Sequence, residues 1–184
     1  MCDYIGSMKV IAIVGVYRSG STWMFNVVKT MLKEAGYSVT WCNDPYKEDA
    51  LESDADFHII KMHEYYKRVH DASDIILTSR RSFNGVERSY RHLRYDLTVD
   101  NDTIRDMFIE YGKWHLFTNY DMEFSDMVTD RLKVVADLTR TVLPEEDHGI
   151  KFCRGVLDIV DEIKPPKRGF DPDTLLFSHH ITKR

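Results

Sequence analysis

The sequence predicts an α/β fold, in which a mostly parallel sheet of about five strands lies between layers of helices. Short apolar runs alternate along the chain with helical patterns, as they do where both faces of a parallel sheet are covered. The first apolar run also meets Gly15 and passes through a turn containing Gly20 into a helical pattern. A strand, a glycine turn and a helix start in this order direct backbone N–H groups and the helix dipole at one anion.

Each element follows from its local pattern. The apolar run 8–15 predicts a strand, and apolar spacing over 21–35 predicts a helix that ends near Gly36. Similar patterns predict the other elements in chain order: strands 38–42, 57–62, 75–79 and 121–125, and helices 82–95, 103–120, 129–142 and 145–163. Ser82 and Thr103 are expected to cap their helices, because a hydroxyl oxygen can accept from the free amides at a helix start.

Composition limits the class of protein. The chain has 184 residues, which suit a single domain over 1–184, and it is 43% hydrophobic and 30% charged, as globular proteins are. A net charge of −5 disfavours a nucleic-acid partner. The longest apolar stretch is far shorter than the ~20 residues that cross a membrane, so no membrane partner is expected either.

The N-terminus and the cysteines favour a cytoplasmic protein. The first residues, MCDYIGS, have no signal-peptide pattern, and Cys2, Cys42 and Cys153 are widely spaced and odd in number, which favours a reducing compartment. The histidines form no H-x-x-x-H pattern and the cysteines no C-x-x-C pattern, so no metal site is expected.

Residues 15–22 have the glycine spacing of a nucleotide-binding loop but lack its lysine. Such loops read G-x-x-x-x-G-K-[ST], and here Ser21 stands where the lysine belongs, with Arg18 earlier in the loop. The lysine holds the β- and γ-phosphates of a nucleoside triphosphate, so its loss disfavours kinase or ATPase chemistry. A cation, several hydroxyls and a helix start still predict a bound anion. The alternative is a glycine turn that holds no ligand.

A second pattern, H-I-I-K-M-H, lies at the end of the expected strand 57–62. Alternation along a strand places Lys61 and His63 on the same side, toward the crevice that such sheets form at the carboxyl ends of their strands. Histidine suits proton transfer because its ordinary pKa, about 6.5, lies near physiological pH. The alternative is an ordinary surface pair.

A third pattern begins just after the expected strand 75–79. Arg81 is followed eight residues later by Ser89. A guanidinium offers a planar fork to a phosphate, and a serine hydroxyl adds one more donor. Arg80 competes with Arg81 for this role, and a solvated basic helix face that includes Arg88 is the alternative.

In this order the segments resemble those of the P-loop sulfotransferases, which move a sulfonate from 3′-phosphoadenosine 5′-phosphosulfate (PAPS) to a hydroxyl or amine. The sequence G-V-Y-R-S-G-S-T-W at 15–23 is similar to the loop for the 5′-phosphosulfate. The K-M-H at 61–63 is similar to the K-[ST]-H signature, and Arg81 with Ser89 to the 3′-phosphate motif. The segment 122–130, M-E-F-S-D-M-V-T-D, resembles a later Y-E-D-L-x-x-D-P segment.

The resemblance implies the P-loop three-layer fold and a small cytosolic, bacterial-type or viral member of that family. It implies a PAPS donor, released as 3′-phosphoadenosine 5′-phosphate (PAP), with no metal required. It also implies His63 as the base that removes the acceptor's proton, with Lys61 and Arg18 holding charge on the donor. The implied donor contacts are Arg18, Ser19, Gly20, Ser21 and Thr22 for the 5′-phosphosulfate, Arg81 and Ser89 for the 3′-phosphate, and Trp23 and Phe124 for the adenine. Met62 and Phe83 depart from the family, which has Ser or Thr and proline at these positions.

The segments that follow the strand ends are expected to line the acceptor pocket. They mix acidic groups with aromatic rings, which suits a small aromatic alcohol or a sugar better than a polyanion; these segments are 43–56, 64–72 and 96–120. The tail, 167–184, is expected to be irregular, and its H-I-T resembles a late segment of bacterial members whose loop closes over the 3′-phosphate. Lys183 and Arg184 either serve that phosphate or fray. No particular oligomeric state is predicted.

Two other functions are compatible with the glycine turn. One is a nucleotide or small-molecule kinase, which would show Mg²⁺-dependent turnover of ATP. The other is a non-catalytic nucleotide-binding module, which would bind the donor without transferring its sulfonate.

Overall fold

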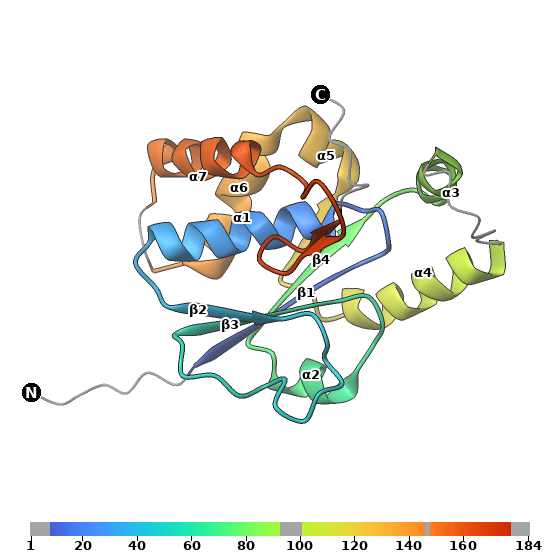
Figure 1. Ribbon diagram of the computed structural model, residues 1–184, viewed down its shortest axis with the longest axis horizontal. Coiled ribbons are helices and arrows are strands. Elements are labelled where there is room, and N and C mark those ends of the chain that lie inside the picture. The colour runs from blue at the N-terminus through green and yellow to red at the C-terminus, as the bar shows by residue number, and fades with distance from the viewer. Residues whose placement is uncertain (1–7, 93–100, 146–147, 178–184) are drawn as a thin grey trace, which may run out of the picture.

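Within residues 8–92, 101–145 and 148–177, which the computed structural model describes, five parallel strands form one sheet (Figure 1). The strands are β1 (Lys9–Gly15), β2 (Val39–Cys42), β3 (Phe57–Met62), β4 (Ile75–Arg80) and β5 (Tyr120–Glu123). Their order across the sheet is β2-β3-β1-β4-β5. The predicted parallel α/β sheet is confirmed, and each strand ends within two residues of its predicted bounds.

Helices cover both faces of the sheet (Figure 1). One layer holds α1 (Ser21–Glu34), α6 (Arg131–Val142) and α7 (Ile150–Glu162), and the other holds α2 (Lys67–Ala72) and α4 (Asn101–His115). Two more helices, α3 (Phe83–His92) and α5 (Phe124–Thr129), follow β4 and β5 closely and therefore begin at the carboxyl edge of the sheet. No helix in the described ranges is both long and apolar enough to cross a membrane.

Two apolar clusters join the sheet to its helix layers. Alternate residues of β1 point to opposite faces: Ile11 and Ile13 pack with α1, α6 and α7, whereas Val10 and Val14 pack with Trp114 on the other side. Both faces of the strand are therefore buried, which explains why its sequence is a continuous apolar run instead of an alternating one.

The parallel pairing brings the functional segments to one edge. Gly15 lies opposite Ser79 on β4, and Ile13 lies opposite Lys61 on β3. The glycine loop (residues 16–20), the chain after β3 and the starts of α3 and α5 all leave the sheet at this carboxyl edge. Open α/β sheets bind ligands at that edge, so the topology alone gathers most of the predicted site residues.

The helix predicted over 103–120 differs from α4 at both ends. α4 ends at His115 because Asn119 enters the sheet: its amide donates to the Ile76 carbonyl (2.8 Å), and its side-chain oxygen accepts from the Ile76 amide (2.7 Å). At its other end α4 already includes Asn101, the first residue described after residue 92, so Thr103 lies inside the helix and the predicted cap there is wrong.

Other boundaries were set by local backbone geometry. α7 begins at Ile150 instead of near Glu145, because Gly149 before it has an extended backbone (ψ 171°). The short helices α2 and α5 are absent from the prediction, and α5 takes the place of the last residues of the strand expected at 121–125. The predicted end of the helix after β4, near 95, lies outside the described residues.

The tail departs furthest from its prediction. Residues expected to be irregular form an antiparallel hairpin of β6 (Phe170–Asp171) and β7 (Leu176–Phe177). Side chains of α1 and β2 bind three successive carbonyl groups between these strands: Trp41 Nε1 donates to Pro172 (3.0 Å), Lys29 Nζ to Asp173 and Asn26 Nδ2 to Thr174 (2.8 Å). Lys183 and Arg184 lie outside the described residues.

Asp130 provides a test of helix capping in this fold. Its carboxylate accepts from the Lys133 amide at the start of α6 (3.1 Å). The substitution Asp130→Ala should lower the free energy of unfolding, measured with urea, by about 0.5–2 kcal/mol, because that amide loses its partner. Asp158→Ala, at an exposed position within α7, is the control and should change it by less than ~0.5 kcal/mol. Equal effects of the two substitutions would show that Asp130 does not act as a cap.

Candidate active site

The glycine loop leaves unpaired amides at the start of α1. Arg18 and Gly20 have left-handed backbone conformations (φ 68° and 92°), and a non-glycine residue held in this way is common at functional sites. No described side chain caps α1, and its first turn holds no acidic residue. The left-handed backbone of Gly20 favours glycine, and a Cβ there would lie 2.8 Å from Sδ of the flexible Met127 side chain. A helix start with free N–H groups and no acid is suited to an anion.

Gly15 lets the loop dock directly on β4. A Cβ at this position would lie 2.2 Å from the Ser79 hydroxyl. The Ser79 carbonyl accepts from the Val16 amide (3.3 Å), and the hydroxyl groups of Ser79 and Ser19 lie 2.7 Å apart. Both serines are fully buried. The Ser19 hydroxyl is thus engaged with β4, and this bond fixes the base of the loop.

Arg18 connects the loop to the segment after β4. Its Nε donates to Ser89 Oγ (3.1 Å), and its backbone carbonyl accepts from Arg81 Nη1 (3.2 Å). The Arg81 guanidinium also lies 3.9 Å above the ring of Phe124. Four residues that the sequence predicts for donor binding are therefore brought into one group.

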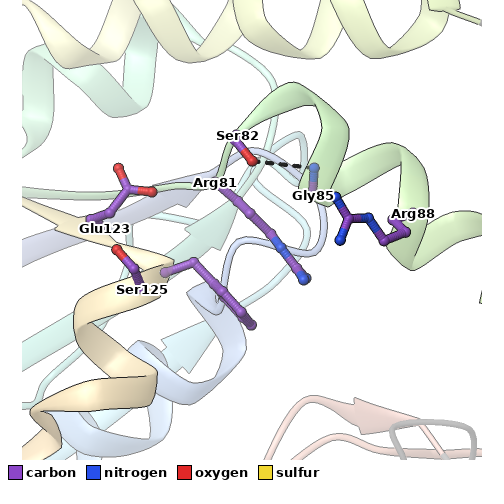
Figure 2. A pocket seen from close by; sticks show the side chains of 7 residues that line it. Arg81, Ser82, Gly85, Arg88, Glu123 and Ser125 are labelled. Carbon is purple, nitrogen blue, oxygen red and sulfur yellow. Dashed lines mark hydrogen bonds between the residues drawn. The ribbon is translucent and has the colours of Figure 1, made fainter.

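A pocket lies beside this group. It is lined by Arg81, Ser82, Gly85, Arg88, Glu123, Phe124 and Ser125. Figure 2 shows Arg88 reaching from α3 toward Arg81, with Glu123 on the other side of Arg81. Ser82 caps α3 as predicted, since its hydroxyl accepts from the Gly85 amide (3.2 Å). A Cβ on Gly85 would lie 2.8 Å from Arg81 Nε, so this glycine leaves room for the guanidinium.

The two adjacent arginines have different surroundings. Arg80 Nε lies 3.0 Å from Asp121 Oδ2 and 2.9 Å from Glu123 Oε2, so its charge is matched by β5. Arg81 has no ion pair with a carboxylate in the described part of the chain, and it faces the pocket. The unmatched charge therefore belongs to Arg81 and not to its competitor.

Like charges accumulate around the pocket. Burial, and then the charges of Arg18 and Arg88, lowers the pKa of Arg81, and burial lowers the pKa of Arg18. None of the three forms an ion pair with a described carboxylate. The described residues also contain no group of three His, Cys, Asp or Glu side chains placed to hold a metal ion. Crowded cations are unfavourable until an anion joins them, so the site suits a ligand with several negative charges.

Lys61 and His63 form a hydrogen-bonded pair. Lys61 Nζ lies 3.0 Å from His63 Nε2, and His63 Nδ1 lies 2.7 Å from the Gly15 carbonyl oxygen. A carbonyl can only accept, so Nδ1 carries the imidazole proton and Nε2 keeps its lone pair. The ring of Tyr17 stacks on the imidazole at 3.8 Å and 17°, which holds the ring plane in place.

Burial sets the charge states of this pair. Burial, and then the charge of Lys61, lowers the pKa of His63 to about 3, although the bond to the Gly15 carbonyl opposes the shift. Burial lowers the pKa of Lys61 to about 8. The ordinary imidazole value that the sequence suggests does not apply here. His63 is a neutral acceptor throughout the physiological range, and Lys61 is largely protonated there.

The remaining predicted residues lie in the first turn of α1. Ser21 is buried, and Thr22 and Trp23 are partly buried. Trp23 packs against the apolar cluster beneath the Arg131 guanidinium, which is 5.4 Å from its ring, and it is not among the pocket-lining residues. Trp23 Nε1 is buried and has no hydrogen-bond partner among the described residues. A buried donor of this kind usually binds a ligand or an ordered water.

Sequence reasoning missed three contributors to the site. Arg88, expected only on a solvated helix face, lines the pocket; its spacing from Gly85 and Arg81 is a helical signal that could have shown this. Ser79 and Tyr17 carry no such signal, because their contacts form only when β4 and the glycine loop pack together.

Comparisons with solved structures identify the fold. Two crystal structures of retinol dehydratase match the chain, one in complex with androsterone and the inactive cofactor PAP (TM-score 0.57, 9% identity) and one with retinol and PAP (TM-score 0.55, 10% identity). The matches cover 85% and 84% of this chain, which spans 66% of the length of each of those chains. No family model and no curated protein matches the sequence. The chain therefore has the α/β fold of these PAP-bound proteins, which confirms the fold that the resemblance implied.

The desolvated charge of Lys61, which is half-buried, should reduce stability. The pKa of Lys61 is about 8 in the folded protein and an ordinary 10.5 in the unfolded chain. Below about pH 8 the folded state therefore bears the full free-energy cost of the desolvated charge, and this cost disappears as the pH rises toward 10.5. Lys61→Met should therefore raise the melting temperature most near or below about pH 7, and its advantage should shrink between these two pKa values. Thermal unfolding across this pH range measures the effect, with the exposed Lys151→Met as control. An advantage that does not change with pH would contradict a desolvated Lys61.

Proposed function

We propose that the protein is a PAPS-dependent sulfotransferase, which transfers a sulfonate to a hydroxyl or amine of a small acceptor. The observation that carries the proposal is the cluster of Arg18, Arg81 and Arg88, unpaired with described carboxylates, on the same sheet edge as the Lys61–His63 pair. The crystal structures with this fold hold PAP, which is what PAPS becomes once its sulfonate has left. In this proposal the chain acts as one catalytic domain in the cytoplasm.

The side chains at the carboxyl edge fit such a donor. The free amides at the start of α1, together with Arg18, suit the 5′-phosphosulfate, and the hydroxyl groups of Ser21 and Thr22 lie in the same turn. Arg81 and Ser89 suit the 3′-phosphate. The residues proposed for the adenine are Phe124 and Trp23, whose indole N–H is unpartnered among the described residues; aromatic stacking contributes about 1–3 kcal/mol per base.

The catalytic pair would divide the chemistry between a base and a cation. When bound, PAPS supplies a sulfonate whose transfer forms a bond from sulfur to the acceptor and breaks the bond from sulfur to the 5′-phosphate oxygen. In this proposal Lys61 turns from His63 Nε2 toward the donor, and Nε2 then takes the acceptor's proton, because Nδ1 already donates to the Gly15 carbonyl. Lys61 and Arg18 stabilise the negative charge that builds up on the leaving phosphate. A bound anion beside Lys61 also raises the pKa of His63 from its low value in the free site, which makes it a better base.

The protein should bind PAP without Mg²⁺, because the cations at this site are side chains. Calorimetric titration in EDTA should show PAP binding, and ATP with Mg²⁺ should bind more weakly because Ser21 replaces the lysine that holds a triphosphate. Equal or tighter binding of ATP, or loss of PAP binding in EDTA, would refute the proposal and favour the kinase. PAP binding with no sulfonate transfer to any acceptor in a broad panel would favour the non-catalytic module.

Arg81 should recognise the 3′-phosphate specifically. Arg81→Ala should weaken PAP binding by roughly 10- to 150-fold, the effect of about 1.5–3 kcal/mol for a charged hydrogen bond, and should weaken adenosine 5′-phosphosulfate far less, since that ligand lacks the 3′-phosphate. Ser89→Ala should show a smaller effect of the same kind. Arg80→Ala is the matched control, because its charge is already paired with Asp121 and Glu123. If Arg81→Ala weakens both ligands equally, Arg81 is structural.

His63→Asn should keep PAP affinity within a few-fold, since an amide N–H can still donate to the Gly15 carbonyl, and should cut turnover by ~10²–10⁴-fold. In the parent enzyme kcat/KM for the donor, which reports the free site, should stay level from about pH 7 to about pH 5, because the pKa of His63 there is about 3. It should fall above about pH 8 as Lys61 loses its proton. The acid limb of kcat should lie at a higher pH, because a bound donor raises the pKa of His63. Near-normal turnover of His63→Asn with a good acceptor would exclude His63 as the base.

A further inference from the structure

An unpaired carboxylate lies next to the proposed catalytic pair. Glu64 follows His63 directly, is exposed, and forms no ion pair with a Lys, Arg or His of the described residues. Its Oε2 accepts from the Tyr46 hydroxyl at 2.6 Å. Burial, and then the charge of Glu64, raises the pKa of Tyr17, the residue whose ring stacks on His63. The negative charge of Glu64 therefore acts on Tyr17, whose ring stacks on the proposed catalytic imidazole.

Two tyrosines, Tyr46 and Tyr17, interact with this carboxylate, and a third lies beside Tyr46. Tyr17 is 38% exposed and Tyr46 is 56% exposed, and the ring of Tyr66 lies 5.1 Å from that of Tyr46. Aromatic faces attract organic cations through the negative charge of the ring face. A carboxylate flanked by exposed aromatic rings is thus a set of groups that recognises an organic ammonium ion.

Two cations of other segments are engaged elsewhere and form no ion pair with Glu64. Lys113 pairs with Glu110, and Arg68 donates to backbone carbonyls of the loop 43–56. The charge of Glu64 would therefore repel an anionic acceptor and attract a cationic one.

We infer that the acceptor is a phenol or alcohol that also carries an ammonium group, with Glu64 as its counter-ion and Tyr46 and Tyr66 beside it. This inference rests on the proposed function, because His63 Nε2 defines where the reacting hydroxyl lies. In the transfer, the acceptor oxygen forms a bond to sulfur, the bond from sulfur to PAP breaks, and the hydroxyl proton passes to His63 Nε2. The ammonium group stays intact and serves only for recognition.

Three phenols of similar size separate charge from shape: tyramine is cationic, 4-ethylphenol is neutral and 3-(4-hydroxyphenyl)propanoate is anionic. Calorimetric titration of each into PAP-saturated protein measures binding without requiring turnover. Tyramine should bind at least ~10-fold more tightly than 4-ethylphenol, and the propanoate should bind most weakly. Glu64→Gln should remove the advantage of tyramine and leave 4-ethylphenol unchanged. Glu34→Gln, an exposed acid at the end of α1, is the charge-matched control and should alter neither.

The outcomes separate this inference from the proposed function. If PAP binds but tyramine and 4-ethylphenol bind equally, if none of the three phenols binds, or if the preference for tyramine survives Glu64→Gln, the inference alone is overturned. If PAP does not bind at all, the proposed function fails and the inference fails with it.

Discussion

Where Gly15 of β1 pairs with Ser79 of β4, the glycine has no side chain and the Ser79 hydroxyl occupies the space. Ser79 then holds the glycine loop through the Val16 amide and the Ser19 hydroxyl. Two residues after Ser79, Arg81 leaves β4 and donates to the carbonyl of Arg18. One close contact between strands therefore fixes the loop, the helix start and the pocket arginines relative to one another. On the other side of β1 the Gly15 carbonyl accepts from His63, so the same glycine also orients the proposed base.

The same edge of the sheet concentrates features that reduce stability. Arg18 has a left-handed backbone, α1 lacks a side-chain cap from the described residues, and Lys61 is a desolvated cation. The arginines around the pocket repel one another. The two apolar clusters on the faces of the sheet and the pinned hairpin of β6 and β7 supply the compensating stability. Unfavourable groups gathered at one place are typical of a binding site, where a ligand of opposite charge relieves them.

Local patterns made part of this structure predictable. The strands, the start of α1 and the position of Lys61 and His63 on the same side follow from alternation and glycine spacing, which depend on neighbours in sequence. The different roles of Arg80 and Arg81 could not be predicted in this way, because they depend on carboxylates that β5 brings to Arg80. The C-terminal hairpin could not be predicted from local patterns either, since its carbonyls are bound by side chains of α1 and β2, which lie far away in the sequence.

The low pKa of His63 was equally inaccessible from the sequence. It arises from burial and from Lys61 at 3.0 Å, and neither can be read from the K-M-H pattern alone. The pattern names the residues, but only packing decides which form of the imidazole is present. Arg88 is different, because its helical spacing from Gly85 and Arg81 could have placed it on their side of α3; packing of α3 at the carboxyl edge then brings that side to the pocket (Figure 2).

A crystal structure of the protein with PAP tests the central claim most directly, namely that the unpaired arginines at the carboxyl edge form a nucleotide site. The 5′-phosphate should lie on the amides at the start of α1 with Arg18 beside it, and the 3′-phosphate should be bound by Arg81 and Ser89. A nucleotide bound elsewhere on the molecule, a 3′-phosphate held by Arg80 in place of Arg81, or crystals grown with excess PAP that show no bound nucleotide would contradict the claim.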